Sequence, residues 1–297
     1  MQTMNDDGVR AGLVGLGRMG GGIAGRLAAA GRLGGVWDID PTRARVVADR
    51  HRVAAADPAG LIQAGCEVLL FAVPTSADVE AALSGIAAPG LTVVDLSTAD
   101  PGHSRSLAQD LARRGIAYFD APMSGGAAGA EAGTLSLMVG GAPEDLARLR
   151  PILLAFAGRI THLGPAGSGH AMKIVHNAVL HATFLATCEG LRVAARAGIA
   201  PERAVEVLNA GNARSYVSEV RFPRDILSGT LNAQSAVATL AKDLRLARAF
   251  SAQSGAPAPF TALTSRLLDQ AAARAPAERD FALLFGEYEE IVREAFE

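Results

Sequence analysis

The chain has 297 residues, of which 49% are hydrophobic and 20% charged, as in ordinary globular proteins. The formal net charge of −2 excludes a whole-chain basic field that would hold nucleic acid or an anionic membrane surface. Charged residues interrupt every apolar run before it reaches the roughly 18 residues of a membrane span. We therefore expect two globular domains that act on a small molecule, with neither a nucleic acid nor a membrane as partner.

The chain lacks the usual signals for export and cross-linking. Its first segment carries Asp6 and Asp7 without an apolar stretch, which is not the pattern of a secretory signal. Cys66 and Cys188 lie far apart in the sequence, which argues against a disulfide framework or a zinc site. We expect a cytoplasmic protein without a bound metal.

Short apolar runs alternate with helical stretches over the first half of the chain. The strand candidates are residues 11–14, 36–40, 52–56, 67–74 and 92–97, and later runs at 116–122, 135–141 and 159–164 extend the same sheet. This alternation is typical of a parallel sheet with crossover helices. It predicts an α/β fold with a doubly wound sheet of Rossmann type.

The second half of the chain has a helical pattern only. The longest predicted helix begins at Ser168, a candidate N-cap, and extends to Ala197, where Gly198 ends it. We place a domain boundary near residue 165. An all-helical domain over 166–297 then follows the sheet domain over 1–165, and the long helix joins the two.

A glycine-rich turn follows the first strand and opens a helix. Its residues are Gly15, Leu16, Gly17, Arg18, Met19 and Gly20. In this setting the first glycine permits a tight turn, the second lets the backbone approach a pyrophosphate, and the third allows close helix packing. Asp38 ends the second strand, near the spacing of the acidic residue that binds a ribose. We interpret the domain as dinucleotide-binding; the alternative is a glycine-rich turn without a ligand.

Asp38 also bears on the choice of dinucleotide. A carboxylate there accepts hydrogen bonds from a ribose diol and repels a 2′-phosphate, which favours NAD over NADP. Arg43 and Arg45 follow a few residues later. They either reach toward a phosphate or lie on a solvated helix face. We expect NAD, and NADP stays open as the alternative.

A second glycine-rich segment spans residues 120–135. Its Ser124, Gly125 and Gly126 offer main-chain N–H groups that can form an anion-binding concavity, which suits a substrate carboxylate. The alternative is a flexible loop that only joins two strands.

A polar stripe crosses the apolar start of the long helix. At spacings of three and four residues, one helix face carries His170, Lys173, Asn177 and His181. A lysine desolvated among apolar side chains can exchange a proton near neutral pH, and we interpret Lys173 in this way. The alternative is a lysine that extends to solvent at a domain boundary. The histidines are interpreted as ordinary helix or interface residues.

Four motifs in this order resemble the β-hydroxyacid dehydrogenase family, which includes 3-hydroxyisobutyrate dehydrogenase and tartronate semialdehyde reductase. They are GLGRMGGGIA at 15–24, DAPMSGGAAGAEAGTL at 120–135, GSGHAMKIVHN at 167–177 and KDLRLA at 242–247. The resemblance covers nearly the whole chain. It implies hydride transfer between NAD and a short 3-hydroxy acid, such as 3-hydroxyisobutyrate, and its semialdehyde.

The resemblance also implies roles for single residues. Lys173 is then the catalytic lysine and Asn177 assists it, while residues 124–126 bind the substrate carboxylate. Lys242 and Asp243, which alone would indicate only a solvated helix face, lie beside the nicotinamide end. Further cofactor contacts fall on two loops that follow strands, at Val73, Pro74, Ser97 and Thr98.

Some positions depart from the family pattern. Asp38 and its neighbours stand where NADP-using members carry an arginine, which supports NAD. Met123 replaces a more common valine. His176 stands where a second asparagine is frequent, so the hydrogen bonds around Asn177 are expected to differ. The substituent on the acid stays open, and the residues that would select it are Met123, Arg214, Tyr216 and Phe222.

Other functions stay open beside this one. They are an NADP-dependent semialdehyde or glyoxylate-type reductase of the same family, and a sensor that binds the dinucleotide without catalysis. Imine reductases share the architecture but lack a lysine at the position of Lys173. The helical domain predicts a homodimer or homotetramer, because several of its apolar residues need cover: Phe250, Phe260, Leu283, Leu284 and Phe285.

Overall fold

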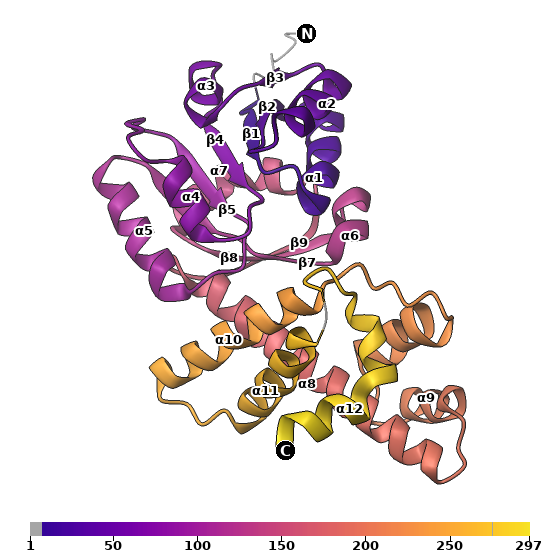
Figure 1. Ribbon diagram of the computed structural model, residues 1–297. Helices are drawn as coiled ribbons and strands as arrows, with labels where there is room; N and C mark the ends of the chain where they lie inside the picture. Colours follow the sequence, from indigo (N-terminus) through magenta and orange to yellow (C-terminus); the bar gives the residue numbers. More distant parts are fainter. Residues whose placement is uncertain (1–7, 275) are drawn as a thin grey trace. The chain divides into compact units, whose positions relative to one another are not determined.

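The computed structural model describes residues 8–274 and 276–297 and divides into two compact units, Met1–Lys173 and Ile174–Glu297 (Figure 1). Asp6 and Asp7 lie outside the described residues. The predicted boundary at residue 165 precedes helix α8 (Ser168–Arg196), whereas the compact units divide within this helix. The helix therefore contributes its first turn to one unit and the rest of its length to the other.

A nine-stranded sheet forms the centre of the first unit over its described residues. The order along the sheet is β3-β2-β1-β4-β5-β6-β8-β7, and β9 pairs with β8. The strands are β1 (Ala11–Val14), β2 (Leu33–Trp37), β3 (Ala54–Ala55), β4 (Val68–Phe71), β5 (Thr92–Asp95), β6 (Ala117–Asp120), β7 (Met123–Ser124), β8 (Leu135–Gly140) and β9 (Ala157–Gly164). The order reverses between β1 and β4, and ligands of such sheets bind at the carboxyl ends of strands beside this switch point.

The strand directions change after β6. Strands β1 to β6 are parallel, as the sequence predicts, but β8 is antiparallel to both β6 and β7, while β9 is parallel to β8. The two-residue strand β7 was not predicted. It pairs with β8 across the short helix α6 (Gly126–Ala132), which allows an antiparallel return without a long crossover. The predicted α/β doubly wound fold is confirmed, with an antiparallel extension.

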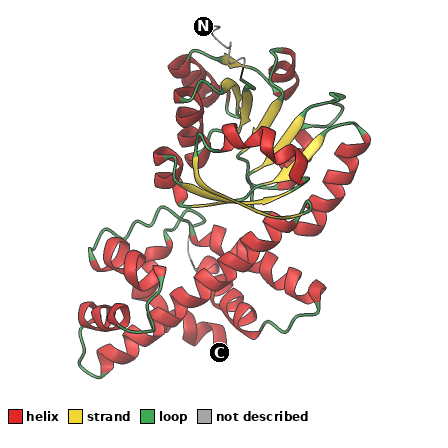
Figure 2. Cartoon of the chain, turned by 180° about the vertical axis from the view of Figure 1, so that it is seen from behind, coloured by secondary structure: helices red, strands yellow, loops and turns green. Residues whose placement is uncertain are grey.

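Helices cover both faces of this sheet (Figure 2). One face packs on α1 (Arg18–Ala29), α2 (Pro41–His51) and α7 (Pro143–Leu153), and the other packs on α3 (Pro58–Gln63), α4 (Ser76–Ala82) and α5 (Pro101–Arg113). Successive strand residues alternate between the two cores: Leu13 belongs to the first and Val14 to the second. Because the central strands are buried on both faces, their sequences are unbroken apolar runs. Each fully buried Leu or Val side chain stabilises the fold by about 1.5–3 kcal/mol.

An Asp-Pro pair starts three of these helices. Asp40, Asp57 and Asp100 are the N-caps of α2, α3 and α5, and each carboxylate accepts main-chain N–H groups of the first turn. The proline that follows each aspartate has no N–H to leave unpaired at the first helical position. The Asp-Pro pairs allow α2, α3 and α5 to begin within a few residues of the strands that precede them.

The second unit is helical throughout its described residues, as predicted. Beyond α8 it contains α9 (Pro201–Ala210), the π-helix η1 (Val217–Leu227), α10 (Val237–Ser254), α11 (Pro259–Ala273), the 3-10 helix η2 (Phe281–Leu283) and α12 (Leu284–Phe296). Its core includes a ring cluster in which Phe184 lies 5.0 Å from Phe281 and 6.0 Å from Phe222 between ring centroids. Phe222 is fully buried in this core. None of the helices in the described part of the chain is long and apolar enough to cross a membrane.

Candidate active site

The turn after β1 has the geometry that its glycines predict. Gly15 adopts φ +89°, which a side chain would strain, and a Cβ there would lie 2.5 Å from the Ala72 carbonyl oxygen at the end of β4. A Cβ at Gly20 would lie 1.9 Å from the Gly15 carbonyl oxygen. Gly17 faces open space and is the N-cap of α1. Open main-chain N–H groups at a helix start, beside the switch point of the sheet, fit a dinucleotide pyrophosphate.

Asp38 clamps this turn to the end of β2. Its Oδ2 accepts the Leu16 N–H at 2.7 Å, and its Oδ1 accepts the Asp40 N–H at 2.9 Å. Arg43 Nη1 lies 3.1 and 3.3 Å from the two carboxylate oxygens. Burial raises the pKa of Asp38, but these two N–H groups and the Arg43 charge outweigh it and lower the pKa below its usual value. Arg43 thus pairs with Asp38 and does not lie on a purely solvated face.

Two loops at the carboxyl ends of β4 and β5 share one buried carboxylate. Asp95 accepts a hydrogen bond from the Ser76 hydroxyl, one from the Ser97 N–H at 2.9 Å and one from the Tyr118 hydroxyl at 3.0 Å. Burial, followed by the charge of Asp95, raises the pKa of Tyr118 well above its usual value. The predicted cofactor contacts lie in these loops: Val73 and Thr98 half-buried, Pro74 exposed and Ser97 buried. Asp95 itself was not predicted as a site residue, although it lies within the strand predicted at 92–97.

Two glycines with positive φ mark the second glycine-rich segment. Gly125 adopts φ +128° and Gly126 φ +66°, and both are exposed beside the half-buried Ser124. Helix α6 follows directly and packs closely on α1, because a Cβ at Gly22 would lie 2.9 Å from the Glu131 nitrogen. The substrate-binding candidates therefore stand on a helix that is in contact with the helix of the fingerprint turn.

Asp120 caps the first turn of α8. Its Oδ1 accepts the Gly167 N–H and its Oδ2 the His170 N–H, both at 2.7 Å. Ser168 was the predicted N-cap, and this prediction is wrong: the helix begins at Ser168, and a carboxylate from the end of β6 accepts its first donors. Lys173 follows one turn later and is half-buried.

Asn177, Asp243 and Lys242 lie together in the second unit. Asn177 is buried, and its Nδ2 donates to Asp243 Oδ2 at 2.7 Å. Lys242 Nζ lies 3.3 Å from Asp243 Oδ1. His176 Nδ1 lies 3.0 Å from Asn177 Oδ1, and since an amide oxygen only accepts, the His176 nitrogen carries the hydrogen. Two motifs predicted separately are thus joined by a hydrogen bond.

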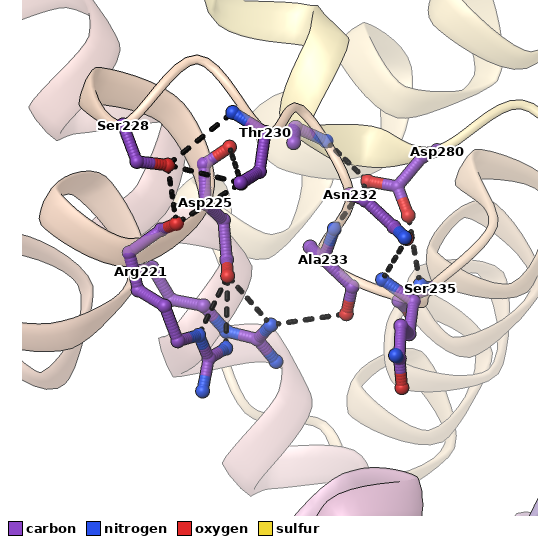
Figure 3. A network of polar contacts seen from close by, with 11 residues as sticks. Arg221, Asp225, Ser228, Thr230, Asn232, Ala233, Ser235 and Asp280 are labelled. Atoms are coloured by element: carbon purple, nitrogen blue, oxygen red, sulfur yellow. Dashed lines mark hydrogen bonds and ion pairs between the residues drawn. The ribbon is translucent and has the colours of Figure 1, made fainter.

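A polar network fixes the loop that precedes α10 (Figure 3). The Asp280 carboxylate accepts the N–H groups of Ala233 and Ser235 at 3.0 and 3.2 Å. Arg221 Nη1 lies 3.1 Å from Asp225 Oδ2 and 3.3 Å from the Ala233 carbonyl oxygen. These contacts position the start of the helix that carries Lys242 and Asp243.

The residues considered for substrate selection occupy different environments. Phe222 belongs to the core, which removes it from a surface role. Arg214 and Tyr216 are exposed, and Arg214 lies 3.7 Å from Glu219. Met123 is half-buried and packs on the sheet core. Within the described residues, no group of three His, Cys, Asp or Glu side chains is arranged to hold a metal ion.

Two family models match the chain. A model described as the NAD binding domain of 6-phosphogluconate dehydrogenase matches residues 10–164, which is more than half of the chain. A model described as NAD-binding of NADP-dependent 3-hydroxyisobutyrate dehydrogenase matches residues 167–287. The first contains the fingerprint turn and residues 124–126, and the second contains Lys173, Asn177 and Asp243.

Full-length relatives support the same grouping. The chain is 30% identical to 2-(hydroxymethyl)glutarate dehydrogenase of Eubacterium barkeri, covering 95% of this chain and 96% of the relative. It is 32% identical to the NAD-dependent L-serine dehydrogenase of Pseudomonas aeruginosa, covering 91% and 95%. A solved structure of Mycobacterium tuberculosis 3-hydroxyisobutyrate dehydrogenase with L-serine matches with a TM-score of 0.87 at 28% identity, covering 95% and 99%. The chain belongs to the β-hydroxyacid dehydrogenase family of NAD(P)-dependent enzymes.

Proposed function

We propose that the chain oxidises a short 3-hydroxy acid of the 3-hydroxyisobutyrate type to its semialdehyde, or reduces the semialdehyde, with NAD as the preferred dinucleotide. One observation carries this proposal. Asn177, one helical turn after Lys173, has its amide fixed by Asp243 at 2.7 Å, on the helix that carries Lys242. A lysine and an oriented amide on one face of α8 match the catalytic pair that the family resemblance implies.

The residues divide the chemistry between them. When bound, the nicotinamide accepts or supplies the hydride. Lys173 Nζ moves the accompanying proton: as a neutral amine it takes the proton from the substrate hydroxyl, and as an ammonium it gives one to the carbonyl oxygen of the semialdehyde. Asn177 orients the substrate or the lysine, and Asp243 keeps the Asn177 amide in one orientation.

The named substrates of the relatives narrow the substrate class. 2-(Hydroxymethyl)glutarate, L-serine and 3-hydroxyisobutyrate all carry a CH₂OH group on the carbon next to a carboxylate, and they differ in the other substituent of that carbon. The main-chain N–H groups of Ser124, Gly125 and Gly126 are our candidates for that shared carboxylate. The half-buried Met123 beside them is our candidate for the substituent.

The preference for NAD rests on Asp38. A buried carboxylate at the end of β2 accepts ribose hydroxyls and repels a 2′-phosphate. Arg43 favours the alternative, an NADP-dependent reductase, because its guanidinium beside Asp38 would attract a phosphate. The ratio of kcat/KM for NAD to that for NADP distinguishes the two, and Arg43→Ala should raise this ratio further.

Replacement of Lys173 tests the proposal. With NAD and a panel of 2-substituted 3-hydroxypropanoates, Lys173→Ala should lower kcat by about 10²- to 10⁴-fold, because proton transfer loses its carrier. Lys173→Arg should be nearly as inactive in oxidation, because an arginine keeps its proton. Binding of NADH, followed by fluorescence, should change little in either variant.

The control is Thr187→Ala, which removes a hydroxyl that donates to a carbonyl of the same helix at 2.7 Å and should leave kcat unchanged. Substantial turnover by Lys173→Ala contradicts the proposal. Binding of NADH by the wild type without turnover of any hydroxy acid favours the sensor instead.

The proposal includes a homodimer or homotetramer in a reducing compartment such as the cytoplasm. Apolar side chains on two helices support the assembly, because Val179 and Val193 of α8 and Phe260 of α11 are 63%, 65% and 78% exposed. Leu284 gives no support, since it is buried within its own unit. Cys66 and Cys188 are free thiols, which supports the compartment. A monomeric mass in solution contradicts the assembly.

A further inference from the structure

A fully buried histidine lies one turn before Lys173. His170 has no exposed surface, and its ring reaches from the first turn of α8 to two other segments of the first unit. Nε2 lies 3.1 Å from the Ser97 carbonyl oxygen, and Nδ1 lies 2.6 Å from the Ser104 hydroxyl in α5. Since a carbonyl oxygen only accepts, Nε2 carries a hydrogen and donates it to Ser97. The imidazole thus connects α8 to the loop after β5.

Contacts to the main chain hold the first turn of α8 against the sheet. Asp120 holds the Gly167 and His170 N–H groups at 2.7 Å each. A Cβ at Gly169 would lie 2.3 Å from the Met138 carbonyl oxygen, so the helix backbone touches β8. The position of the helix start, and of Lys173 one turn later, is therefore set by main-chain contacts.

The loop after β5 is held by side chains instead. The Leu96 N–H still donates to the Phe71 carbonyl of β4 at 2.9 Å. Beyond Leu96, two polar contacts fix the main chain at Ser97: its N–H donates to Asp95 at 2.9 Å and its carbonyl accepts from His170. Asp95 also binds the Ser76 hydroxyl next to the loop after β4. Ser76, Asp95, Ser97 and His170 therefore form one connected network of hydrogen bonds. Burying such polar groups is tolerated because each of them is paired.

We propose that His170 is a positioning residue for hydride transfer. Through Ser97 it sets the loop that contains the cofactor candidates Ser97 and Thr98 at a fixed distance from the helix turn that carries Lys173. This inference rests on the proposed function, because it assigns the network a role in placing the proton carrier against the nicotinamide. It differs from a purely structural role, in which loss of the imidazole lowers stability and leaves the turnover of folded enzyme unchanged.

Two variants of His170 test the inference. His170→Leu removes both ring contacts, and at a temperature well below its Tm it should lower kcat about tenfold or more while KM for the hydroxy acid changes less than threefold, because a misplaced catalytic group loses rate before binding. His170→Gln keeps an N–H donor that can reach the Ser97 carbonyl, and it should recover most of kcat. His162→Leu is the control: His162, in β9 of the same unit, lies 2.9 Å from the Gly141 carbonyl oxygen, and its loss should leave kcat unchanged.

Hydrogen exchange gives a readout that does not depend on activity. In His170→Leu, peptides over residues 96–104 should exchange faster, peptides over residues 168–173 should change little because Asp120 still holds the helix start, and His162→Leu should leave both unchanged. If His170→Leu does not fold, Ser104→Ala and His170→Gln carry the same comparison with smaller expected changes. Unchanged kcat in folded His170→Leu, or unchanged exchange over residues 96–104, overturns the inference. Failure of the proposed function is separate, since then the wild type does not turn over or Lys173→Ala stays active.

Discussion

The two parts of helix α8 are held by different kinds of contact. In its first turn the main chain makes contacts of its own, beside those of the His170 ring, since Asp120 accepts two N–H groups and Gly169 lies against the Met138 carbonyl. Farther along, side chains make them: Asn177 donates to Asp243, and Phe184 enters the ring cluster of the second unit. At Gly190 a Cβ would meet nothing within 4 Å.

We expect the two kinds of contact to affect different quantities, the free energy of unfolding and the rate of turnover. Main-chain anchors fix a helix without presenting a reactive group, so their loss should appear first in the free energy of unfolding. Side-chain anchors such as Asp243 orient one amide, so their loss should appear first in turnover. Asp120 and Asp243 are both buried carboxylates. They differ in what they bind: Asp120 accepts main-chain N–H groups, and Asp243 accepts the side-chain amide of Asn177.

The largest expected effect on stability is at Asp120. Asp120→Asn turns an amide N–H toward one of the two main-chain donors and leaves it unpaired, which should lower the free energy of unfolding by about 2–4 kcal/mol in urea denaturation. The exposed Asp145→Asn in α7 serves as control and should change it by less than about 0.5 kcal/mol. If Asp120→Asn lowers the free energy of unfolding by less than about 1 kcal/mol, the proposed difference between Asp120 and Asp243 is contradicted.

Two glycines of α8 test the same contrast with one substitution. Gly169→Ala places a Cβ 2.3 Å from a carbonyl oxygen, so the backbone must move, and the free energy of unfolding should fall by about 2 kcal/mol or more. Gly190→Ala should raise it by about 0.5–1 kcal/mol, because alanine restricts the unfolded chain and favours the helix. Thermal unfolding of both variants gives the comparison, and shifts of equal sign would contradict it.

Asp243 should affect turnover more than stability. Asp243→Asn keeps the shape of the side chain but weakens the charge-assisted bond to Asn177, which should lower kcat/KM about tenfold, equivalent to about 1.4 kcal/mol. The Tm should fall by only a few degrees. Arg245→Ala, two residues away on the exposed side of α10, is the control for kcat/KM. A large fall in Tm with unchanged kcat/KM would show that Asp243 contributes to stability, as Asp120 does, and not to turnover.

Asp38 is a third carboxylate, and pH should reveal its smaller contribution. It accepts two N–H groups as Asp120 does, and its pKa in the folded protein lies below the unfolded value of 3.8. Its stabilisation is therefore present above that value and is lost as the pH falls through the folded pKa. The stability difference between wild type and Asp38→Asn should be constant near neutral pH and should shrink as the pH falls from about 5 to below 3.8. A difference that stays constant would show that the carboxylate charge does not contribute.

Local patterns predicted most of the fold. The strand runs and the stop of α8 at Gly198 are properties of neighbouring residues, and the helix ends within one residue of its predicted end at Ala197. The Asp-Pro helix starts are equally local but were not predicted. The roles of Gly15 and Gly20 in the turn were also predicted, because a fingerprint turn depends on only a few consecutive residues.

Contacts between distant segments could not be predicted in this way. His170 and Ser97 are 73 residues apart, and nothing in either sequence neighbourhood pairs them. His170 was interpreted as an ordinary helix or interface residue, and Asp95 was given no role within the strand predicted at 92–97. The π-helix η1, which contains Pro223, was also not predicted. A signal that could have identified Asp95 and Asp120 is their shared position at the carboxyl ends of parallel strands.

The close packing of α6 on α1 at Gly22 joins two predicted binding segments into one rigid block. A designer who reshapes α6 to admit a bulkier acid would also displace the helix behind the pyrophosphate turn. In the proposed assignment, selectivity for the acid and affinity for the dinucleotide would then change together.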